Sequence, residues 1–337
     1  MASVKITYPN NNDHVTFLTQ AQFDFYKDEN RFIPHEPVLK PREIDLSFPT
    51  SVNFTWEPAC SGIVQISTDP DFSVCEEFSR NNGTAPVCNL LHDKTYFCRV
   101  KVNDEYSPVV TFSVDADKPR WINLPAVTNV RDLGLWENGE GKRIKQGMLF
   151  RGAQFQSDME NKQFITEEGI KILLDQLHVR MDLDLRGATE GTKAVPVERY
   201  EKISMSAYAT WGEHGIFTDV QQENVRKVFD ILADETAYPI YFHCAGGGDR
   251  TGTIAFLLEA MLGLDDESLV TEYELSNLSV SGERHRFTEV WTKFMEKLET
   301  YVPGGTRKEQ VIAFLKTCGV TDETMNKIRA ILLEPVK

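Results

Sequence analysis

Short runs of alternating apolar and polar residues occupy the first third of the chain. Polar residues, prolines and glycines separate them, and they lie at residues 51–56 (SVNFTW), 62–68 (GIVQIST), 96–102 (YFCRVKV) and 109–114 (VVTFSV). Alternation with a period of two is the pattern of strands with one buried face. Strands of this length and spacing typically pack as two sheets, so residues 1–118 are predicted to form an all-β sandwich.

The pattern changes after residues 115–125 (DADKPRWINLP), where two prolines and a charge run interrupt the periodicity. Beyond this boundary, strand-like and helix-like runs alternate. An amphipathic helix is expected from Thr166, followed by strands at 179–185 and 202–207. Residues 119–337 are therefore predicted to form an α/β domain with a mostly parallel central sheet flanked by helices.

One stretch of this second domain, residues 238–252 (YPIYFHCAGGGDRTG), joins a strand to a helix through a glycine-rich turn. Backbone N–H groups in such a turn and in the first turn of the helix have no carbonyl partner, so they can point at one anion. Three consecutive glycines let the chain bend closely around that anion, because glycine has no Cβ. The predicted phosphate-binding residues are Ala245, Gly246, Gly247, Gly248 and Thr251.

The two ends of this turn carry a thiol and a guanidinium, Cys244 and Arg250, with five residues between them. The amide dipoles, the helix N-terminus and Arg250 all favour negative charge, so the thiol is expected to ionise well below the value of about 8.5 of a free cysteine. Arg250 can hold two oxygens of a phosphoryl group, and the Thr251 hydroxyl can donate a hydrogen bond to the thiolate. A cysteine after a buried strand is most often a small core residue. The combination with three glycines, Arg, Thr and Gly favours a nucleophile.

The segment HCAGGGDRTG resembles the His-Cys-(five residues)-Arg-Thr-Gly signature of cysteine-dependent protein tyrosine phosphatases, and its Asp-Arg pair resembles the atypical bacterial branch of that family. Residues 128–134 (TNVRDLG), 147–154 (GMLFRGAQ) and 181–190 (MDLDLRGATE) are similar to segments that this branch carries in the same order. The resemblance covers about residues 125–333. It implies the cysteine-phosphatase fold and hydrolysis of phosphomonoesters through a phosphocysteine, with no cofactor and no metal.

Gly248 departs from the pattern of the branch, which usually has lysine just before the aspartate. The preference for highly charged phosphoinositides that such a lysine implies is therefore in doubt. Arsenate reductases, low-molecular-weight phosphatases and rhodanese relatives also use a cysteine-to-arginine loop, but the preceding histidine and the RTG ending argue against them. A protein tyrosine phosphatase is favoured. A phosphoinositide, inositol-phosphate or dual-specificity phosphatase of the same mechanism and a non-catalytic phospho-ligand binding protein are the alternatives.

The general acid has three candidates. By resemblance it is Asp249, which would protonate the leaving-group oxygen. The alternative acids are Asp219 and Glu213, in residues 208–219 (YATWGEHGIFTD), where classical tyrosine phosphatases carry a mobile acid loop. This chain lacks the tryptophan-proline-aspartate triplet expected there, which favours Asp249.

Charged residues gather at two further places in the second domain. Asp184, Arg186 and Glu190 follow a predicted strand at its carboxyl end, where open α/β sheets bind ligands. They either orient the catalytic turn or form a structural salt-bridge cluster. Arg131 and Asp132 lie near the active-site mouth by resemblance, or else belong to a polar network that holds the fold together.

The first domain carries a resemblance of its own. Residues 48–72, with Trp56 just before Glu57-Pro58 and ISTDPDF at the end, resemble a fibronectin type III or related immunoglobulin-like module. Trp56 is expected to be a core residue. No binding partner of this domain is indicated.

Composition narrows the partners and the compartment. The 337 residues are 41% hydrophobic and carry a formal net charge of -15, which argues against nucleic acid or anionic membrane as a general partner. The resemblance implies a phosphorylated protein or small phosphomonoester as the substrate. No signal-like start or long apolar run is present, so neither a secretion signal nor a membrane span is expected. The predicted location is cytoplasmic, and secretion through a removed signal is the alternative. The spacing of Cys60, Cys75, Cys88 and Cys98 allows one or two disulfides. Reduced thiols are expected, because an enzyme that needs a thiolate suits a reducing compartment.

Overall fold

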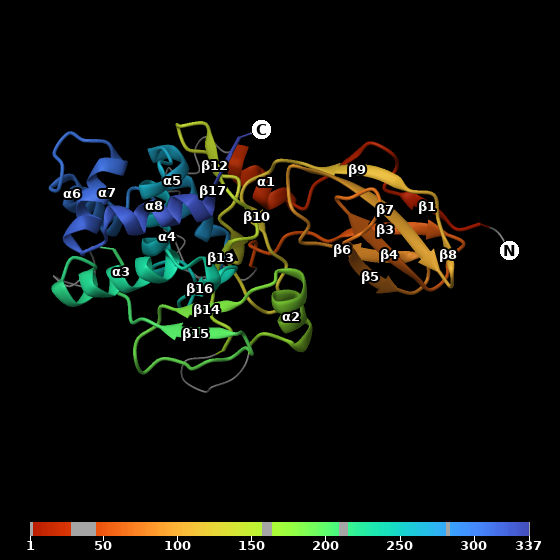
Figure 1. Ribbon diagram of the computed structural model, residues 1–337, viewed down its shortest axis with the longest axis horizontal. Coiled ribbons are helices and arrows are strands. Elements are labelled where there is room, and N and C mark those ends of the chain that lie inside the picture. The colour runs from red at the N-terminus through yellow and green to blue at the C-terminus, as the bar shows by residue number, and fades with distance from the viewer. Residues whose placement is uncertain (1–2, 28–44, 157–163, 209–214, 281–283, 337) are drawn as a thin grey trace. The chain divides into compact units, whose positions relative to one another are not determined.

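A computed structural model describes residues 3–27, 45–156, 164–208, 215–280 and 284–336. The chain divides into two compact units, one made of residues 1–20 and 49–123 and the other of residues 21–48 and 124–337 (Figure 1). Each unit has its own sheets and its own buried residues, and each is described by itself.

The N-terminal unit contains two sheets. One has the order β1 (Lys5–Tyr8), β3 (Val52–Glu57), β6 (Thr84–Val87). The other has the order β2 (Asp13–Val15), β9 (Val110–Val114), β7 (Lys94–Val102), β4 (Gly62–Ser67), β5 (Glu76–Arg80), with β8 (Glu105–Tyr106) paired to β7. The short strand β10 (Arg120–Trp121) lies near the end of this unit.

Both sheets of this unit contribute to one hydrophobic core. Trp56 and Phe54 come from one sheet and Val64 and Phe112 from the other, and all four are at most 2% exposed. The four strands predicted from alternation are confirmed as β3, β4, β7 and β9. Strand β5 was missed because its sequence, EEFSR, is almost wholly polar.

The cysteines of this unit are not joined to one another. The structure contains no disulfide between any two of the cysteines it describes. Cys98 is buried in the core, and burial raises the pKa of its thiol to about 12. This thiol is therefore a packing residue that stays protonated at neutral pH.

The sheet of the C-terminal unit has the order β11 (Arg131–Asp132), β13 (Leu149–Gly152), β16 (Ile240–His243), β14 (Met181–Asp184), β15 (Arg199–Lys202). Strand β16 is parallel to both of its neighbours, and its last residue, His243, is in register with Gly152 and Asp184. The carboxyl ends of three strands therefore meet at one edge of the sheet, which is where such sheets bind ligands.

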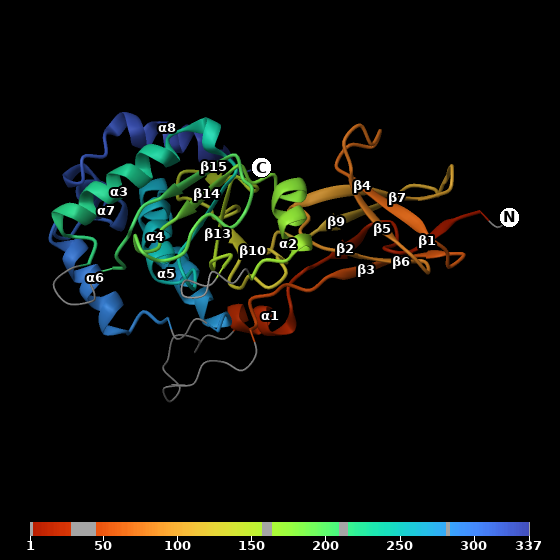
Figure 2. The same ribbon diagram turned by 90° about the horizontal axis from the view of Figure 1, so that it is seen from below.

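Helices cover this sheet on two sides. In both views α3 (Asp219–Leu232) and α4 (Arg250–Leu262) lie on one side, and α2 (Glu167–Lys171) lies on the other (Figures 1 and 2). The remaining elements are α1 (Gln20–Lys27), a π-helical turn at Ile172–Gln176, 3-10 turns at Glu235–Ala237 and Leu275–Leu278, α5 (Asp266–Glu274), α6 (Glu289–Glu299), α7 (Arg307–Thr317), α8 (Asp322–Leu332), and the pair β12 (Lys142–Ile144) and β17 (Leu333–Pro335).

Helix α4 is the central helix of this unit. Every residue from Thr251 to Leu262 is buried, so the helix is surrounded by protein on all sides, and most of its residues are apolar. It ends at Gly263, whose φ of 100° places it in the left-handed region that glycine adopts without strain. Within the described part of the chain, no helix combines the length and apolar character that spanning a membrane requires.

Two local predictions have opposite outcomes. Thr166 does begin a helix, because its hydroxyl accepts a hydrogen bond from the backbone N–H of Gly169 at 3.0 Å. The strand predicted at 202–207 is wrong in its bounds, since β15 ends at Lys202. Residues 203–207 still alternate in burial, because the chain stays extended beyond the end of β15. There the Ile203 N–H donates to the carbonyl of Asp184, at the end of β14, at 2.9 Å.

Candidate active site

The turn between β16 and α4 brings the predicted site residues together. Cys244 directly follows β16 and is 3% exposed, and Arg250 is the first residue of α4. The turn lies at the carboxyl edge of the parallel strands. We call residues 244–250 the cradle.

The carbonyl groups of residues 244–249 are all held by partners outside the cradle. The acceptors and donors are Cys244 O with His243 Nδ1 at 3.0 Å, Ala245 O with Gln154 N at 3.1 Å, Gly246 O with Asn129 Nδ2 at 3.0 Å, Gly247 O with Arg151 Nη2 at 2.7 Å, Gly248 O with the Tyr208 hydroxyl at 3.2 Å, and Asp249 O with Thr253 N at 2.8 Å. These donors come from different parts of the C-terminal unit. The backbone path of the cradle is therefore fixed from outside at every residue from Cys244 to Asp249.

This arrangement determines the direction of the N–H groups. In a planar trans peptide the N–H points opposite to the carbonyl of the same unit. Since the carbonyls from Cys244 to Asp249 are bound on the outer side, the N–H groups of residues 245–250 are directed to the inner side. A turn whose amides converge, followed by a helix N-terminus, is a binding site for phosphate.

Position 247 of the cradle accepts only glycine. Its φ is 71°, and a Cβ there would lie 2.4 Å from the backbone C and O atoms of Gly152 at the end of β13. Both the left-handed conformation and the close approach of β13 require glycine at this position. Gly152 is constrained in turn, because a Cβ there would lie 2.2 Å from the hydroxyl of Tyr241.

Thr251 is buried beside the start of α4, and its hydroxyl has no hydrogen-bond partner among the residues that the structure describes. A buried hydroxyl without a partner costs about 1–3 kcal/mol. A hydroxyl left in this state next to the cradle is suited to bond a thiolate or a phosphoryl oxygen.

His243 lies beneath the nucleophile candidate and is 1% exposed. Its Nε2 is 3.0 Å from Asp182 Oδ1, and its Nδ1 donates to the carbonyl of Cys244. Burial lowers the pKa of His243, but the charges of Asp182 and Asp184 and the hydrogen bonds outweigh it, so the pKa lies above that of a free histidine. A charged imidazolium here adds to the positive potential around Cys244.

Arg250 pairs with Glu190. Its Nη1 donates to Glu190 Oε2 at 2.7 Å, and the Gly187 N–H donates to the same oxygen at 3.1 Å. Burial raises the pKa of Glu190, but the hydrogen bonds from Arg250 and Gly187 and the charges of Arg250 and Arg186 hold it below its usual range. Of the two interpretations of Glu190, its contact with Arg250 favours orientation of the turn.

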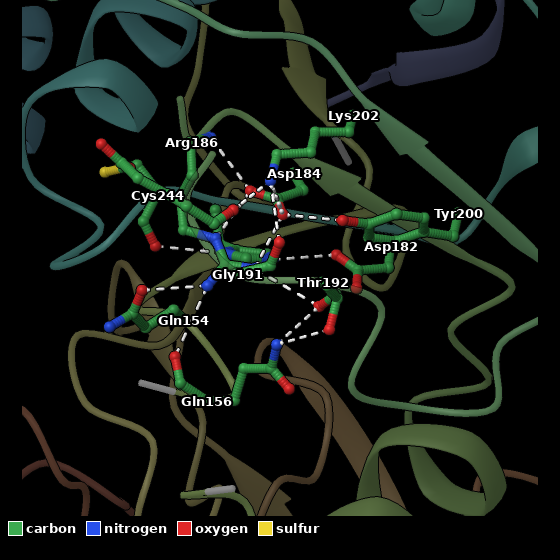
Figure 3. Close-up of polar contacts among 12 residues, drawn as sticks. Gln154, Gln156, Asp182, Asp184, Arg186, Gly191, Thr192, Tyr200, Lys202 and Cys244 are labelled. Atoms are coloured by element: carbon green, nitrogen blue, oxygen red, sulfur yellow. Dashed lines mark hydrogen bonds and ion pairs between the residues drawn. The ribbon is translucent and has the colours of Figure 1, made fainter. Parts of the chain in front are cut away.

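Asp184 and Arg186 form a buried pair with a different role. Arg186 donates through Nε and Nη2 to the two carboxylate oxygens of Asp184 at 2.8 and 2.7 Å, and through Nη1 to Gln154 Oε1 at 3.1 Å (Figure 3). In Figure 3 the sulfur of Cys244 points away from this pair. Because the Gln154 N–H binds the Ala245 carbonyl, the pair supports the cradle from the side without facing the sulfur.

Asp249, the acid expected from the resemblance, is the residue before α4. Its Oδ2 accepts a hydrogen bond from Arg284 Nη2 at 2.7 Å, and its side chain is 44% exposed. The Asp249 side chain does not cap α4. Arg284 also lies beside Gly248, where a Cβ would be 3.2 Å from its Nε and Nη2 atoms.

The alternative acids have different positions. Asp219 is the exposed first residue of α3, where a carboxylate stabilises the positive end of the helix dipole. Glu213 lies outside the described residues. Of the two candidate acids that the structure describes, only Asp249 belongs to the cradle.

Some residues of this site were missed from the sequence. Tyr208 was seen only as the start of a loop, and neither Glu272 nor Glu259 was singled out. Glu259 carried a usable signal, because it is the one charged residue in the apolar run 251–262, and a buried carboxyl is rare without a specific reason. Tyr208 and Glu272 carried none, because their contacts depend on segments far apart in the sequence.

Cys244 and Arg250 thus stand at the two ends of one turn between a strand and a helix of an α/β unit. The family model described as the tyrosine phosphatase family matches residues 122–334. This chain belongs to the tyrosine phosphatase family.

Two curated relatives are similar to part of the chain. The triple specificity protein phosphatase PtpB of Mycobacterium tuberculosis is 28% identical over 138 residues, which are 33% of this chain and 49% of that protein. A tyrosine-protein phosphatase of Nostoc commune is 28% identical over 136 residues, which are 33% of this chain and 44% of that protein. The matches span about half the length of these curated relatives.

Among solved structures, the core catalytic domain of the PP-IP phosphatase SIW14 from S. cerevisiae, in complex with citrate, is 14% identical with a TM-score of 0.29. It covers 45% of this chain and 84% of that chain.

Replacing Gly247 tests the geometry of the cradle. Gly247→Ala is expected to lose about 1–2 kcal/mol of unfolding free energy from the left-handed φ and about 1–3 kcal/mol more from the collision with Gly152. Gly304→Ala is the matched control, because Gly304 has a φ of 70° and open space around its Cβ position. Urea unfolding of both variants measures the difference. Equal losses would show that the collision is absent.

The protonation of His243 is a second test. Its pKa is raised, so its interaction with Asp182 contributes stability that is fully present below the unfolded value of about 6.5 and is lost as pH rises through the folded pKa. In Asp182→Asn the histidine is expected to titrate at lower pH, because burial then acts with less opposition. NMR titration of the imidazole Cε1 proton measures both proteins. A wild-type His243 that titrates below a free histidine would contradict this account.

Proposed function

We propose that this chain is a cysteine-dependent protein tyrosine phosphatase that hydrolyses phosphomonoesters through a phosphocysteine intermediate. The observation that carries the proposal is that every carbonyl from Cys244 to Asp249 is bound by a donor outside the cradle. By the geometry of the trans peptide, this binding directs the amides of residues 245–250 inward, between Cys244 and Arg250. Family membership supports the same reaction. A cradle built only to hold a loop together would not need its amides to converge.

In the first step the Cys244 thiolate attacks phosphorus in line with the ester oxygen. The S–P bond forms, the P–O bond breaks, and Asp249 gives its proton to the leaving oxygen. Asp249 pairs with Arg284 in the structure.

In the second step water attacks phosphorus. Asp249 takes a proton from the water, the S–P bond breaks, and Cys244 is released as a thiolate together with inorganic phosphate. The inward amides and Arg250 hold the phosphoryl oxygens through both steps, and their interactions strengthen as charge spreads over these oxygens. The Thr251 hydroxyl, which has no hydrogen-bond partner among the described residues, would stabilise the thiolate as it leaves.

A phosphoinositide, inositol-phosphate or dual-specificity phosphatase is the second candidate function. Gly248 lacks the lysine of similar chains, but Arg284 brings a guanidinium to the same place from a different segment. An added cation beside the cradle favours substrates that carry more than one anionic group. A similar protein is named a triple specificity phosphatase, which supports a wider substrate range as a proposal for this chain.

We also propose the domain organisation that the sequence predicts. Residues 1–118 would form a fibronectin type III or immunoglobulin-like sandwich, and residues 119–337 the catalytic domain. Two sheets that share one core support the first assignment. The compact units divide the chain differently, because residues 21–48 group with the catalytic unit.

Loss of the nucleophile tests the proposed reaction. Wild-type protein is expected to hydrolyse p-nitrophenyl phosphate in a vanadate-sensitive manner, and Cys244→Ser is expected to lose at least about 10³-fold in kcat because serine is not ionised at neutral pH. Cys318→Ser replaces another buried thiol and is expected to keep the activity. A wild-type protein that binds vanadate without turnover would instead support the non-catalytic binding protein. Comparison of phosphotyrosine peptides, phosphoserine peptides and phosphoinositides then separates the two phosphatase candidates.

The acid assignment has its own test. Asp249→Asn is expected to lower kcat about 10²- to 10⁴-fold for phenyl phosphate, and much less for p-nitrophenyl phosphate, whose leaving group needs little protonation. Asp219→Asn is expected to behave as wild type with both substrates. The dependence on the leaving group separates an acid from a residue that only braces the cradle. A loss in Asp219→Asn with none in Asp249→Asn would overturn the assignment.

A further inference from the structure

Four ionisable side chains are buried next to the cradle. Arg131 comes from β11, Arg151 from β13, Glu259 from α4 and Glu272 from α5, and each is at most 1% exposed. Charged groups are almost never fully buried unless they are paired. We call these four residues the buried cluster, and their burial calls for a structural or functional reason.

One carboxylate oxygen connects the two arginines. Glu272 Oε1 accepts from Arg131 Nε at 2.7 Å and from Arg151 Nη1 at 3.0 Å. The far side of Arg151 reaches the cradle directly, because its Nη2 donates to the Gly247 carbonyl at 2.7 Å. Glu272 thus fixes Arg151 at the angle needed to hold that carbonyl.

Arg131 reaches the neighbouring residue of the cradle through an amide. Its Nη1 donates to Asn129 Oδ1 at 2.6 Å, and Asn129 Nδ2 donates to the Gly246 carbonyl at 3.0 Å. The Glu272 carboxylate on α5 therefore supports two adjacent cradle carbonyls indirectly. It does so through Arg151 for Gly247, and through Arg131 and Asn129 for Gly246. The partners of the other cradle carbonyls do not involve the buried cluster.

Glu259 completes the buried cluster without pairing. Neither of its carboxyl oxygens has a hydrogen-bond partner among the described residues. Its electrostatic neighbours are Glu272, Arg151 and Arg131. Burial and the charge of Glu272 together raise the pKa of Glu259 well above its usual range, whereas the two arginines lower it. An ionised carboxylate in this position would lack the hydrogen bonds that make a buried charge tolerable.

Arg131 stays charged despite its burial. Burial and the charge of Arg151 lower the pKa of Arg131 to about 10, which is still far above neutral pH. The buried cluster with a neutral Glu259 then contains two guanidinium charges against one carboxylate.

We propose that the buried cluster sets both the shape and the charge of the cradle: Arg151 and the Arg131–Asn129 pair turn the Gly247 and Gly246 carbonyls outward, and a neutral Glu259 leaves one net positive charge beneath the phosphoryl site. This inference rests on the proposed function for its catalytic consequence. The members of the buried cluster are positioning residues, since they act on the phosphoryl site through the cradle and touch no reacting atom.

A buried positive charge acts strongly on an anion bound in the cradle. In a region without water, an uncompensated cation acts on a neighbouring anion with much less screening than in solution. The charge beneath the cradle therefore favours both the thiolate and the bound phosphoryl group. Fixing the Gly246 and Gly247 carbonyls has a second effect, on the shape of the cradle. Without their donors, these two peptide units could rotate and present a carbonyl oxygen to the anion in place of an N–H.

The test replaces Arg151 and reads the reactivity of Cys244 directly. Arg151→Gln removes one cation and the donor to Gly247, so alkylation of Cys244 by iodoacetamide at pH 6.5 is expected to slow roughly tenfold, with peptide mapping used to separate Cys244 from the other cysteines. Arg151→Lys keeps the charge but cannot span Glu272 and the Gly247 carbonyl together. Alkylation is then expected within about threefold of wild type, whereas kcat falls about 10²-fold because the cradle is misplaced.

The control is a second buried arginine of the same unit that does not contact the cradle. Arg143 on β12 is 6% exposed and pairs with Glu334 at 2.9 Å. Arg143→Gln is expected to lower the melting temperature without slowing alkylation of Cys244. If Arg151→Gln fails to fold, the split between alkylation and kcat in Arg151→Lys still decides the question. Alkylation at the wild-type rate in Arg151→Gln, or parallel losses in Arg151→Lys, would overturn the inference.

The neutral form of Glu259 has an independent readout in stability. A carboxyl whose folded pKa is raised costs nothing below its unfolded pKa of about 4.3 and costs increasingly more as pH rises above it. Glu259→Gln is therefore expected to melt at a higher temperature than wild type at pH 7.5, and the difference is expected to vanish near pH 4. A variant that melts lower than wild type at both pH values would show that Glu259 is ionised and paired. The alkylation and melting readouts need no turnover, so an inactive wild type would refute the proposed function alone.

Discussion

The outward binding of the cradle carbonyls is the constraint on which the rest of the site depends. A peptide unit has only one orientation that points its N–H at the anion, and an unbound turn would satisfy its carbonyls and amides in mixed directions. Each outward carbonyl needs a donor, and the donors here are two backbone amides and the side chains of histidine, asparagine, arginine and tyrosine. The cradle is thus shaped by the whole C-terminal unit, and the glycines only permit that shape.

The sheet explains why these donors can meet at one place. Parallel strands β13, β16 and β14 end in register at Gly152, His243 and Asp184. The segments that leave them are therefore neighbours although they lie far apart in sequence. Arg151 is at the end of β13, and Asn129 precedes β11, which pairs with β13. A register shift of one residue would point Arg151 to the opposite face of the sheet and leave the Gly247 carbonyl without a donor.

The sequence located the site but not its supports. The strand, glycine turn and apolar helix at 238–262 are continuous in sequence, so local pattern was enough to place Cys244, Arg250 and Asp249 in one turn. Continuity also explains why α4 and the central strand were predicted closely. The partners of the cradle come from segments that only tertiary structure brings together.

The sequence also could not show which charged residues contact the catalytic turn. The sequence left open whether Arg186 and Glu190 orient the catalytic turn or form a structural cluster, because residue type alone does not show which way a side chain points. The structure separates them, since Arg186 is sealed against Asp184 whereas Glu190 reaches Arg250. The helix that contains Phe25 was missed for a related reason, as its mixed polar sequence, QAQFDFYK, gives only a weak periodic signal.

Exposure divides the ion pairs of this site into two kinds. Arg250–Glu190 and Arg284–Asp249 lie at the accessible side of the cradle, with side chains 15% to 44% exposed. Partly solvated pairs contribute little stability, so a phosphoryl dianion can replace or join the carboxylate at low cost. The pairs of Glu272 with Arg131 and Arg151 are at most 1% exposed, and breaking one would leave a bare charge in the interior at about 3–5 kcal/mol. The cations that meet the substrate are therefore the ones that can exchange partners, and the cations that shape the cradle are the ones that cannot.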